Sequence, residues 1–280
     1  MNLILQGSAD QTTIQALAAL ARPARVEAIN GQAWRCVDVD DSTQTRERIG
    51  TASLAARLDA TFIEPGLQLS DFRLLAMDMD STVITIECID EIADMQGLKP
   101  RVAAITEAAM RGEIEFAESL TRRVALLEGL DADALQKVYD ERLALSPGAD
   151  TLIAAARAAG VRTLLVSGGF TFFTDRVKER LELDYSHANV LEVANGRLTG
   201  KVVGGIVDAE EKKRTVERVC AELNVPTSRA IVVGDGANDL KMMSVAGLSV
   251  AYRAKPVVRA QAHVALNFSG LDGILALLAQ

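Results

Sequence analysis

The chain has 280 residues, of which 49% are hydrophobic and 24% charged, the balance of a globular protein with a substantial core. A formal net charge of −8 argues against a nucleic-acid partner, whose phosphates require a basic surface. No apolar run reaches the roughly 20 residues of a membrane-spanning helix, so we expect no membrane partner. Three scattered cysteines and an N-terminus unlike a signal peptide predict a cytoplasmic protein.

The first part of the chain is predicted to form a small α+β domain over residues 1–68. Its elements are strands at 2–6, 24–29, 33–39 and 60–64 and helices at 10–21 and 43–58. This order is that of a ferredoxin-like unit and resembles the ACT domains of amino-acid metabolism. Asn30-Gly31 predicts a hairpin, and Pro65-Gly66 predicts a linker. Two roles stay open: a module that senses serine or forms a homodimer, and a packing domain.

From residue 72 onward the pattern is that of an α/β protein. A buried strand is predicted at 72–77, and residues 86–145 contain four helical segments without a strand. Strands and helices then alternate, with strands at 161–166, 229–233, 248–251 and 263–266, a hairpin at 189–203, and helices at 148–159, 171–181, 210–223, 238–246 and 271–279. The alternation predicts a doubly wound parallel sheet over 72–280 with a helical insertion.

The ends of three predicted strands carry polar residues, and ligands of parallel sheets bind at these ends. Asp78 and Asp80 follow the strand at 72–77 and can face a substrate and its leaving group, although a polar loop capping the strand has the same pattern. Ser167-Gly168-Gly169 precedes a helix, where backbone N–H groups can approach an anion. Glycine-rich turns between a strand and a helix are also common without any binding role.

The third strand end is followed by Asp235-Gly236-Ala237-Asn238-Asp239, whose oxygen atoms suit a hard cation such as Mg²⁺. An Asx-rich turn is the alternative interpretation. Lys212 lies in a charged run that could be a solvated helix face, or it could point inward as the cation that a phosphate and several carboxylates require. The two histidines stand in no motif, so the chemistry is expected to depend on carboxylates.

These four motifs, in this order, resemble those of the haloacid-dehalogenase-like phosphohydrolases, and within them the phosphoserine phosphatase family. The resemblance covers residues 72–280 and rests on five strings: DMDSTVITIECIDEIA at 78–93, ITEAAMRGEIEFAESLTRRVALL at 105–127, VSGGFTFF at 166–173, GRLTG at 196–200, and GDGANDLKMMSVAGLSVAYRAKP at 234–256. It implies a Rossmannoid core with a helical cap inserted at about 86–145.

The resemblance also implies the roles of the site residues. Asp78 would be the nucleophile that forms an aspartyl-phosphate, and Asp80 the general acid and base. Mg²⁺ would be held by Asp78, the main-chain carbonyl of Asp80, and Asp235. The phosphoryl group would be bound by Ser167, Gly168, Lys212 and Asn238, with Asp239 orienting its neighbours. O-Phosphoserine would be recognised by Glu87, Met110, Phe116 and Arg123.

For the cap residues a structural interpretation stays beside the functional one. Glu87 could favour a helix N-terminus, Arg123 could be a surface residue, and Met110 and Phe116 could belong to the core of the cap. A runner-up function is hydrolysis of another small phosphomonoester, or transfer of the phosphoryl group to an alcohol.

Overall fold

The structure is a computed structural model that describes residues 1–110 and 113–279, except for the side chain of Met110. Its strands are β1 (Asn2–Gln6), β2 (Arg25–Asn30), β3 (Ala33–Val37), β4 (Asp59–Ile63), β5 (Leu74–Met77), β6 (Arg162–Phe170), β7 (Tyr185–Ala194), β8 (Arg197–Val203), β9 (Ala230–Gly234), β10 (Leu248–Tyr252) and β11 (Val264–Leu266). Its helices are α1 (Gln11–Leu20), α2 (Thr43–Ala55), α3 (Cys88–Asp94), α4 (Lys99–Met110), α5 (Phe116–Ala125), α6 (Asp133–Glu141), α7 (Ala149–Ala158), α8 (Thr171–Leu181), α9 (Ala209–Glu222), α10 (Leu240–Met243), α11 (Pro256–Arg259) and α12 (Gly273–Leu278). Within the described ranges no helix is both long enough and apolar enough to cross a membrane.

The N-terminal strands form an antiparallel sheet in the order β2-β3-β1-β4. That order, with one helix after β1 and one after β3, is the ferredoxin-like arrangement, which confirms this part of the predicted fold class. Asp10 begins α1 as its N-cap, because its side chain accepts a hydrogen bond from the Thr13 N–H at 2.7 Å. One face of the sheet is covered by α1 and α2, with Leu3, Leu5 and Ile14 in the core between them.

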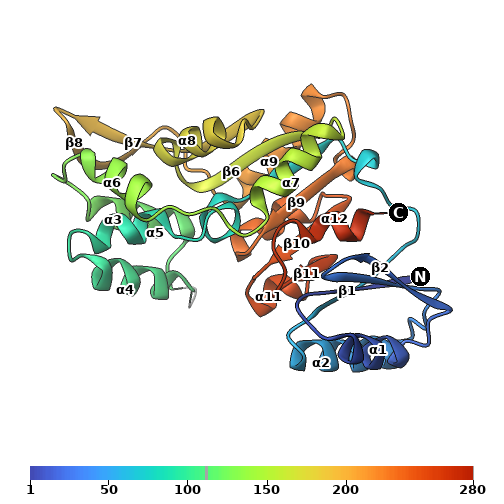
Figure 1. Ribbon diagram of the computed structural model, residues 1–280. Helices are drawn as coiled ribbons and strands as arrows, with labels where there is room; N and C mark the ends of the chain where they lie inside the picture. The colour runs from blue at the N-terminus through green and yellow to red at the C-terminus, as the bar shows by residue number, and fades with distance from the viewer. Residues whose placement is uncertain (111–112, 280) are drawn as a thin grey trace.

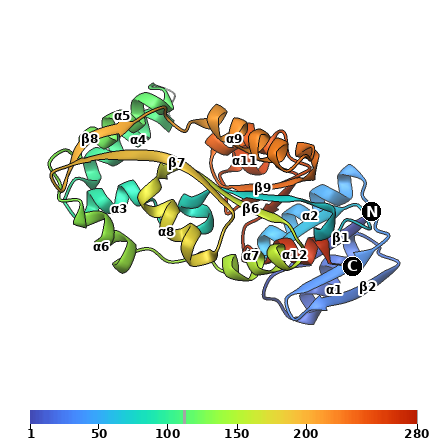
Figure 2. The same cartoon turned by 90° about the horizontal axis from the view of Figure 1, so that it is seen from above.

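The opposite face of this sheet packs against the C-terminal part of the chain. Ile4 and Ile63 belong to the same apolar cluster as Leu277 and Leu278 of α12. Figure 1 shows the small sheet beside α12 and β11, with the cap helices at the far end of the molecule, and Figure 2 shows the same separation from above. The N-terminal unit therefore shares apolar core with the larger sheet and lies at the end opposite to the cap.

The second sheet has seven strands in the order β11-β10-β9-β5-β6-β7-β8, parallel except for β8. The chain fills the sheet outward from β5 in both directions, so a topological switch point lies between β5 and β9. Alternate residues of β5 face opposite sides: Leu75 and Met77 pack in the cluster with α7, α8 and α12, whereas Leu74 and Ala76 pack in the cluster with α9, α10 and α11. Helices on both faces confirm the predicted doubly wound sheet.

Four helices, α3 to α6, form within the predicted insertion, and they pack beside the end of the β7–β8 hairpin. The Leu198 carbonyl accepts a hydrogen bond from the Gly129 N–H at 2.8 Å, and the Leu198 N–H donates to the Leu130 carbonyl at 2.8 Å. The hairpin thus holds the connection between α5 and α6. Sequence alone could not predict this pairing, because the partners are about 70 residues apart in the chain.

Two strands are longer than the sequence predicts. β6 continues through Ser167-Gly168-Gly169 to Phe170, with an irregularity in its pairing with β7 between Val166 and Phe170. β7 begins at Tyr185, four residues before the predicted hairpin, because its first half pairs with β6 in the main sheet. This half of β7 contains partly buried polar residues such as His187, so it lacks the apolar pattern from which a strand is predicted.

Candidate active site

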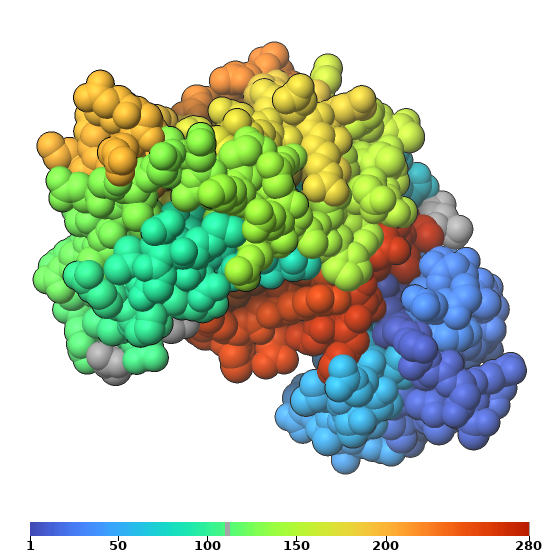
Figure 3. All heavy atoms as spheres, turned by 60° about the vertical axis from the view of Figure 1, so that its left-hand side comes forward, coloured from blue at the N-terminus to red at the C-terminus, as the bar shows by residue number. Residues whose placement is uncertain are grey.

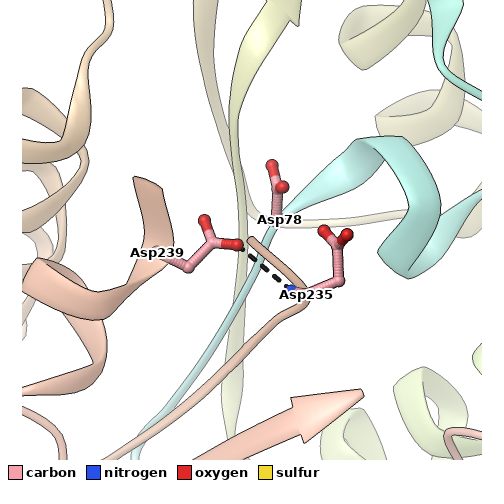
Figure 4. A group of neighbouring side chains, drawn as sticks. All are labelled: Asp78, Asp235 and Asp239. Atoms are coloured by element: carbon pink, nitrogen blue, oxygen red, sulfur yellow. Dashed lines mark hydrogen bonds between the residues drawn. The ribbon is translucent and has the colours of Figure 1, made fainter. Parts of the chain in front are cut away.

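The switch point of the large sheet brings two acidic residues together. Asp78 directly follows β5 and Asp235 directly follows β9, and the Asp78 N–H donates to the Val233 carbonyl at 3.0 Å, so that the ends of these strands stay side by side. Figure 4 shows Asp78 and Asp235 at these two strand ends, and Asp239 on the turn that follows, with a hydrogen bond from the Asp235 N–H to its carboxylate. One oxygen atom of each carboxylate lies within 4.8 Å of those of the other two.

A fully buried lysine connects these carboxylates. Lys212, in the first turn of α9, is 0% exposed, and its Nζ donates to Asp78 Oδ1 at 2.8 Å and to Asp239 Oδ1 at 2.8 Å. Burial lowers the pKa of Lys212, but the charges of Asp239 and Asp78 outweigh it and raise the pKa overall. Lys212 is therefore a fixed cation of the site, and not a residue of a solvated helix face.

The loop after β9 requires its glycines and orders Asp239. The second carboxylate oxygen of Asp239 accepts hydrogen bonds from the N–H groups of Asp235 at 3.2 Å and Gly236 at 3.0 Å. A Cβ at Gly234 would collide with the Asp239 carboxylate, and one at Gly236 would collide with the Asn238 side chain. Both oxygens of Asp239 are thus occupied by protein donors, which distinguishes Asp239 from Asp78 and Asp235.

Crowding of buried carboxylates weakens their acidity. Burial, followed by the charge of Asp239, raises the pKa of Asp78 well above its ordinary value. Burial and the charges of Asp239 and Glu87 raise the pKa of Asp235 to about 7. Neighbouring carboxylates in a partly dry site favour a cation between them. The donor set, all oxygen, is the one that a hard divalent cation prefers.

Asp80 lies on a tight turn over Met79–Val83, in which Ser81 adopts a left-handed conformation with φ of 57°. Its Oδ1 atom is buried and has no hydrogen-bond partner among the described residues. Burial, followed by the charge of Glu87, raises the pKa of Asp80 to about 8. Gly169 allows the Asp80 side chain to lie close to the end of β6. A Cβ at this position would lie 3.0 Å from Asp80 Oδ2 and 3.0 Å from Ser167 Oγ.

The end of β6 forms another wall of the site. Ser167 is 1% exposed, and its Oγ accepts a hydrogen bond from the Gly169 N–H at 2.8 Å. The Gly168 carbonyl accepts from Asn189 Nδ2 at 2.8 Å, which fixes the backbone of the turn. A Cβ at Gly168 would lie 3.0 Å from the Phe116 ring, so this cap residue contacts the core at Gly168.

Core and cap enclose one cavity of about 680 Å³. Of the residues predicted from the sequence, the cavity is lined by Asp78, Asp80, Glu87, Phe116, Arg123, Ser167, Gly168, Asp235 and Asn238. Lys212 and Asp239 lie behind this surface and reach it through Asp78. Met110 ends α4, and its side chain is outside the described part of the structure.

Two charged cap residues, Glu87 and Arg123, line this cavity. Glu87 precedes α3 and accepts a hydrogen bond from Ser81 Oγ at 2.8 Å. Burial lowers the pKa of Arg123 on α5, while the charges of Asp90 and Glu87 act to raise it. Arg123 Nε donates to the Ser119 carbonyl at 3.4 Å. A half-buried cation, Arg123, and an exposed anion, Glu87, thus line the cavity together with the carboxylates of the core.

Among the residues that line the cavity, sequence reasoning did not single out Ser81, Asp90 or Lys255. Helical spacing could have indicated Asp90, three residues after Glu87 and therefore on the same side of α3. The positive φ that turns Ser81 toward Glu87 leaves no signal in a single sequence. Lys255 reaches the cavity from the segment after β10, and its N–H donates to the Asp235 carbonyl at 3.3 Å.

The sequence matches known families over most of its length. The family model of haloacid dehalogenase-like hydrolases matches residues 75–244, and that of a domain of unknown function matches residues 3–49. Phosphoserine phosphatases of Polaromonas sp. and Albidiferax ferrireducens are 57% and 56% identical over 219 and 218 residues, which cover 76% of this chain and 93% and 92% of those proteins.

Solved structures are similar to the whole chain. A HAD family hydrolase from Salmonella enterica serovar Typhi has a TM-score of 0.90 and 33% identity, covering 100% of this chain and 99% of that one. A probable phosphoserine phosphatase from Vibrio cholerae has a TM-score of 0.84 and 35% identity, covering 99% and 86%. The chain belongs to the phosphoserine phosphatase family of the haloacid dehalogenase-like hydrolases.

Proposed function

We propose that the chain is a Mg²⁺-dependent phosphatase that hydrolyses O-phosphoserine to serine and phosphate, the last step of serine biosynthesis in the cytoplasm. One observation carries this proposal: a single cavity is lined by the core carboxylates Asp78 and Asp80 and by the cap residues Glu87 and Arg123. A phosphorylated amino acid requires the core carboxylates for its phosphoryl group and the charged cap residues for its carboxylate and ammonium groups. A substrate-bound phosphoserine phosphatase with a TM-score of 0.69 and 36% identity covers 73% of this chain and adds support.

The residues of the core fit a magnesium ion. Asp78 and Asp235 offer carboxylate oxygens at the mouth of the switch point, whereas both oxygens of Asp239 accept hydrogen bonds from protein donors. We assign the ion to Asp78, the main-chain carbonyl of Asp80, and Asp235. When bound, Mg²⁺ offsets the negative charge of nucleophile and phosphate and fixes their relative orientation.

In the first step, an oxygen of the Asp78 carboxylate attacks phosphorus in line with the bond to the seryl oxygen. The new P–O bond makes an aspartyl-phosphate, and the bond to serine breaks. Asp80, in its protonated form, gives its proton to the departing seryl oxygen. The buried Oδ1 of Asp80, which has no hydrogen-bond partner within the described part of the chain, supports this role, because a substrate atom could supply that partner.

In the second step, Asp80 is a carboxylate and accepts a proton from water. That water attacks phosphorus on the side opposite to Asp78, the P–O bond to Asp78 breaks, and phosphate leaves. Asp80 is protonated and Asp78 is ionised again, so the cycle closes without another base. Because the hydrolysis is divided into two in-line displacements, one carboxyl group can donate a proton in the first step and accept a proton in the second.

The phosphoryl oxygens would be held by Ser167, the Gly168 backbone, Asn238 and Lys212. A lysine ammonium group has three N–H donors, and two of those of Lys212 form hydrogen bonds with Asp78 and Asp239. The third is available for a phosphoryl oxygen, where charge spreads in the loose transition state of phosphoryl transfer. Asp239 would act by holding Lys212 in place.

The amino-acid end of the substrate would be recognised by the cap. Arg123 can bind the carboxylate through its guanidinium fork, and Glu87, already oriented by Ser81, can accept from the ammonium group. Phe116, in contact with Gly168, would cover the phosphoryl group and exclude water. We also propose that Met110 contributes to this roof.

Release of phosphate from O-phosphoserine tests the proposal, with Mg²⁺, without it, and with EDTA followed by added Mg²⁺. We expect turnover only with the metal and its full return on re-addition. Turnover that survives EDTA would contradict the metal assignment. Comparison of kcat/KM for phosphoserine, phosphothreonine and other small esters, with and without an added alcohol, separates the runner-up functions.

We further propose that residues 1–68 and 72–280 are two domains, with the cap in 86–145. Separate sheets support this division, although Ile4 and Ile63 join the larger core. Serine sensing and homodimer formation by the first domain stay predictions.

A further inference from the structure

A second cavity, of about 550 Å³, lies at the seam between the N-terminal domain and the C-terminal residues. Figure 3 shows this seam, where the blue N-terminal atoms meet the red C-terminal ones. The cavity shares no lining residue with the catalytic one. It is lined by Ser8, Ala56 and Arg57 from the first domain and by Arg253, Asn267 and Phe268 from the second.

The charge of this cavity is opposite to that of the whole chain. The chain has a formal net charge of −8, yet two of the six described lining residues are arginines and none is acidic. Neither arginine forms an ion pair with a described residue. The Arg57 guanidinium lies 5.5 Å from the centre of the Phe268 ring across the seam, and that of Arg253 lies 5.2 Å from the Tyr252 ring. Each guanidinium group thus lies within cation–π distance of an aromatic ring.

Among the described residues, Asp59, a buried carboxylate at the seam, forms no ion pair with either arginine. Asp59 is 2% exposed and accepts hydrogen bonds from the backbone N–H groups of Asn267 at 2.7 Å, Phe268 at 3.1 Å and Ser269 at 2.8 Å. It therefore fixes the loop that carries one wall of the cavity. Asn267 Oδ1 in turn accepts from Arg259 Nη1 at 3.2 Å, which adds a third guanidinium nearby.

We propose that this seam cavity is a binding site for a small oxyanion, held between the guanidinium forks of Arg57 and Arg253. Planar guanidinium groups bind carboxylate and phosphate groups through paired hydrogen bonds, and two of them from opposite walls match the charge of such a ligand. Ser8 and Asn267 line the same cavity and add polar groups around it. Because the ligand would contact both domains, its binding would also hold the seam closed.

Arginine-specific modification of the full chain with phenylglyoxal, followed by peptide mapping, tests this site directly. One arm adds inorganic phosphate and the other adds acetate, so that the phosphate and carboxylate sources are separated. We expect one or both anions to slow modification of Arg57 and Arg253 together, by about fourfold at about three times Kd. Arg22 is the matched internal control: it is exposed, belongs to the first domain, and has a left-handed backbone like Arg57 and Arg253.

Single variants distinguish the seam from the active site. In Arg57→Gln, protection of Arg253 should be lost, and in Arg253→Gln, protection of Arg57 should be lost. Arg57→Gln should also keep the turnover of the parent chain. The proposal is wrong if neither anion protects the pair, or if one arginine stays protected when the other is replaced.

Discussion

Two buried carboxylates, Asp59 in the small sheet and Asp78 at the end of a strand of the large sheet, have very different surroundings. Asp59 is 2% exposed and Asp78 is 5% exposed. Asp59 is surrounded by backbone N–H donors of one loop, which are neutral and satisfy it completely. Asp78 instead faces a buried lysine and two more carboxylates, and burial raises its pKa well above the ordinary value.

The difference teaches that burial alone does not identify a functional acid. A carboxylate with neutral donors on every side has no capacity left for a ligand, so Asp59 has a structural role and joins β4 to the loop after β11. A carboxylate among like charges is balanced only in part and gains from a cation and a substrate. The following substitutions test this comparison, ordered from the largest expected effect on turnover to the smallest.

Asp78→Asn should reduce turnover of phosphoserine by at least about 10⁴-fold, because an amide cannot act as the nucleophile. The measurement is phosphate release under single-turnover conditions. Thermal unfolding must show a folded variant, which we expect because Lys212 keeps its contact with Asp239. An active Asp78→Asn protein would remove the basis of the proposed mechanism.

Gly234→Ala should lower kcat by about 100-fold, since a displaced Asp239 would move Lys212 and the proposed metal ligand Asp235 together. Gly31→Ala is the matched control, because a Cβ at Gly31 meets no atom within 4 Å. Equal activity of the two variants would contradict the positioning role of Asp239.

Arg123→Ala should lower kcat/KM for phosphoserine by about 30-fold, the value of a charge-assisted hydrogen bond of about 2 kcal/mol. A phosphate ester without a carboxylate should be affected much less. Arg122→Ala, the exposed neighbour that pairs with Glu118 at 2.5 Å, serves as control. Equal losses for both esters would indicate a structural role for Arg123.

Asp59→Asn should leave turnover within about twofold of the parent, while the free energy of unfolding falls by about 2 kcal/mol, because part of a buried set of N–H donors loses its acceptor. Urea unfolding measures the second effect, with the exposed Asp41→Asn as control. A large loss of activity at unchanged stability would break the contrast with Asp78.

Much of this arrangement could be predicted from local pattern. Asn30-Gly31 and the strand–helix order specified the small sheet, and apolar strands followed by acidic turns at Asp78 and Asp235 specified the edge of the large one. These signals depend on neighbours in the chain, so a single sequence contains them. The inward direction of Lys212 was left open by its charged run, since only the packed site decides which face of α9 is buried.

Other features depend on contacts between distant segments. The pairing of β8 with the cap near Gly129, the extension of β6 through Gly168, and the seam between Arg57 and Phe268 have no periodic signature. Ser81 shows the same limit at short range, because its left-handed turn follows from the packing of the loop around Asp80. Tertiary structure, and not local preference, sets these positions.

The most direct test of the central claim is to locate the phosphoryl group during turnover. The enzyme is mixed with phosphoserine and Mg²⁺, quenched in acid within one turnover, and digested for mass spectrometry. We predict a phosphorylated, base-labile peptide in which the modified residue is Asp78, absent from Asp78→Asn. A phosphoryl group on another residue, or none in an enzyme with demonstrated turnover, would contradict Asp78 as the nucleophile.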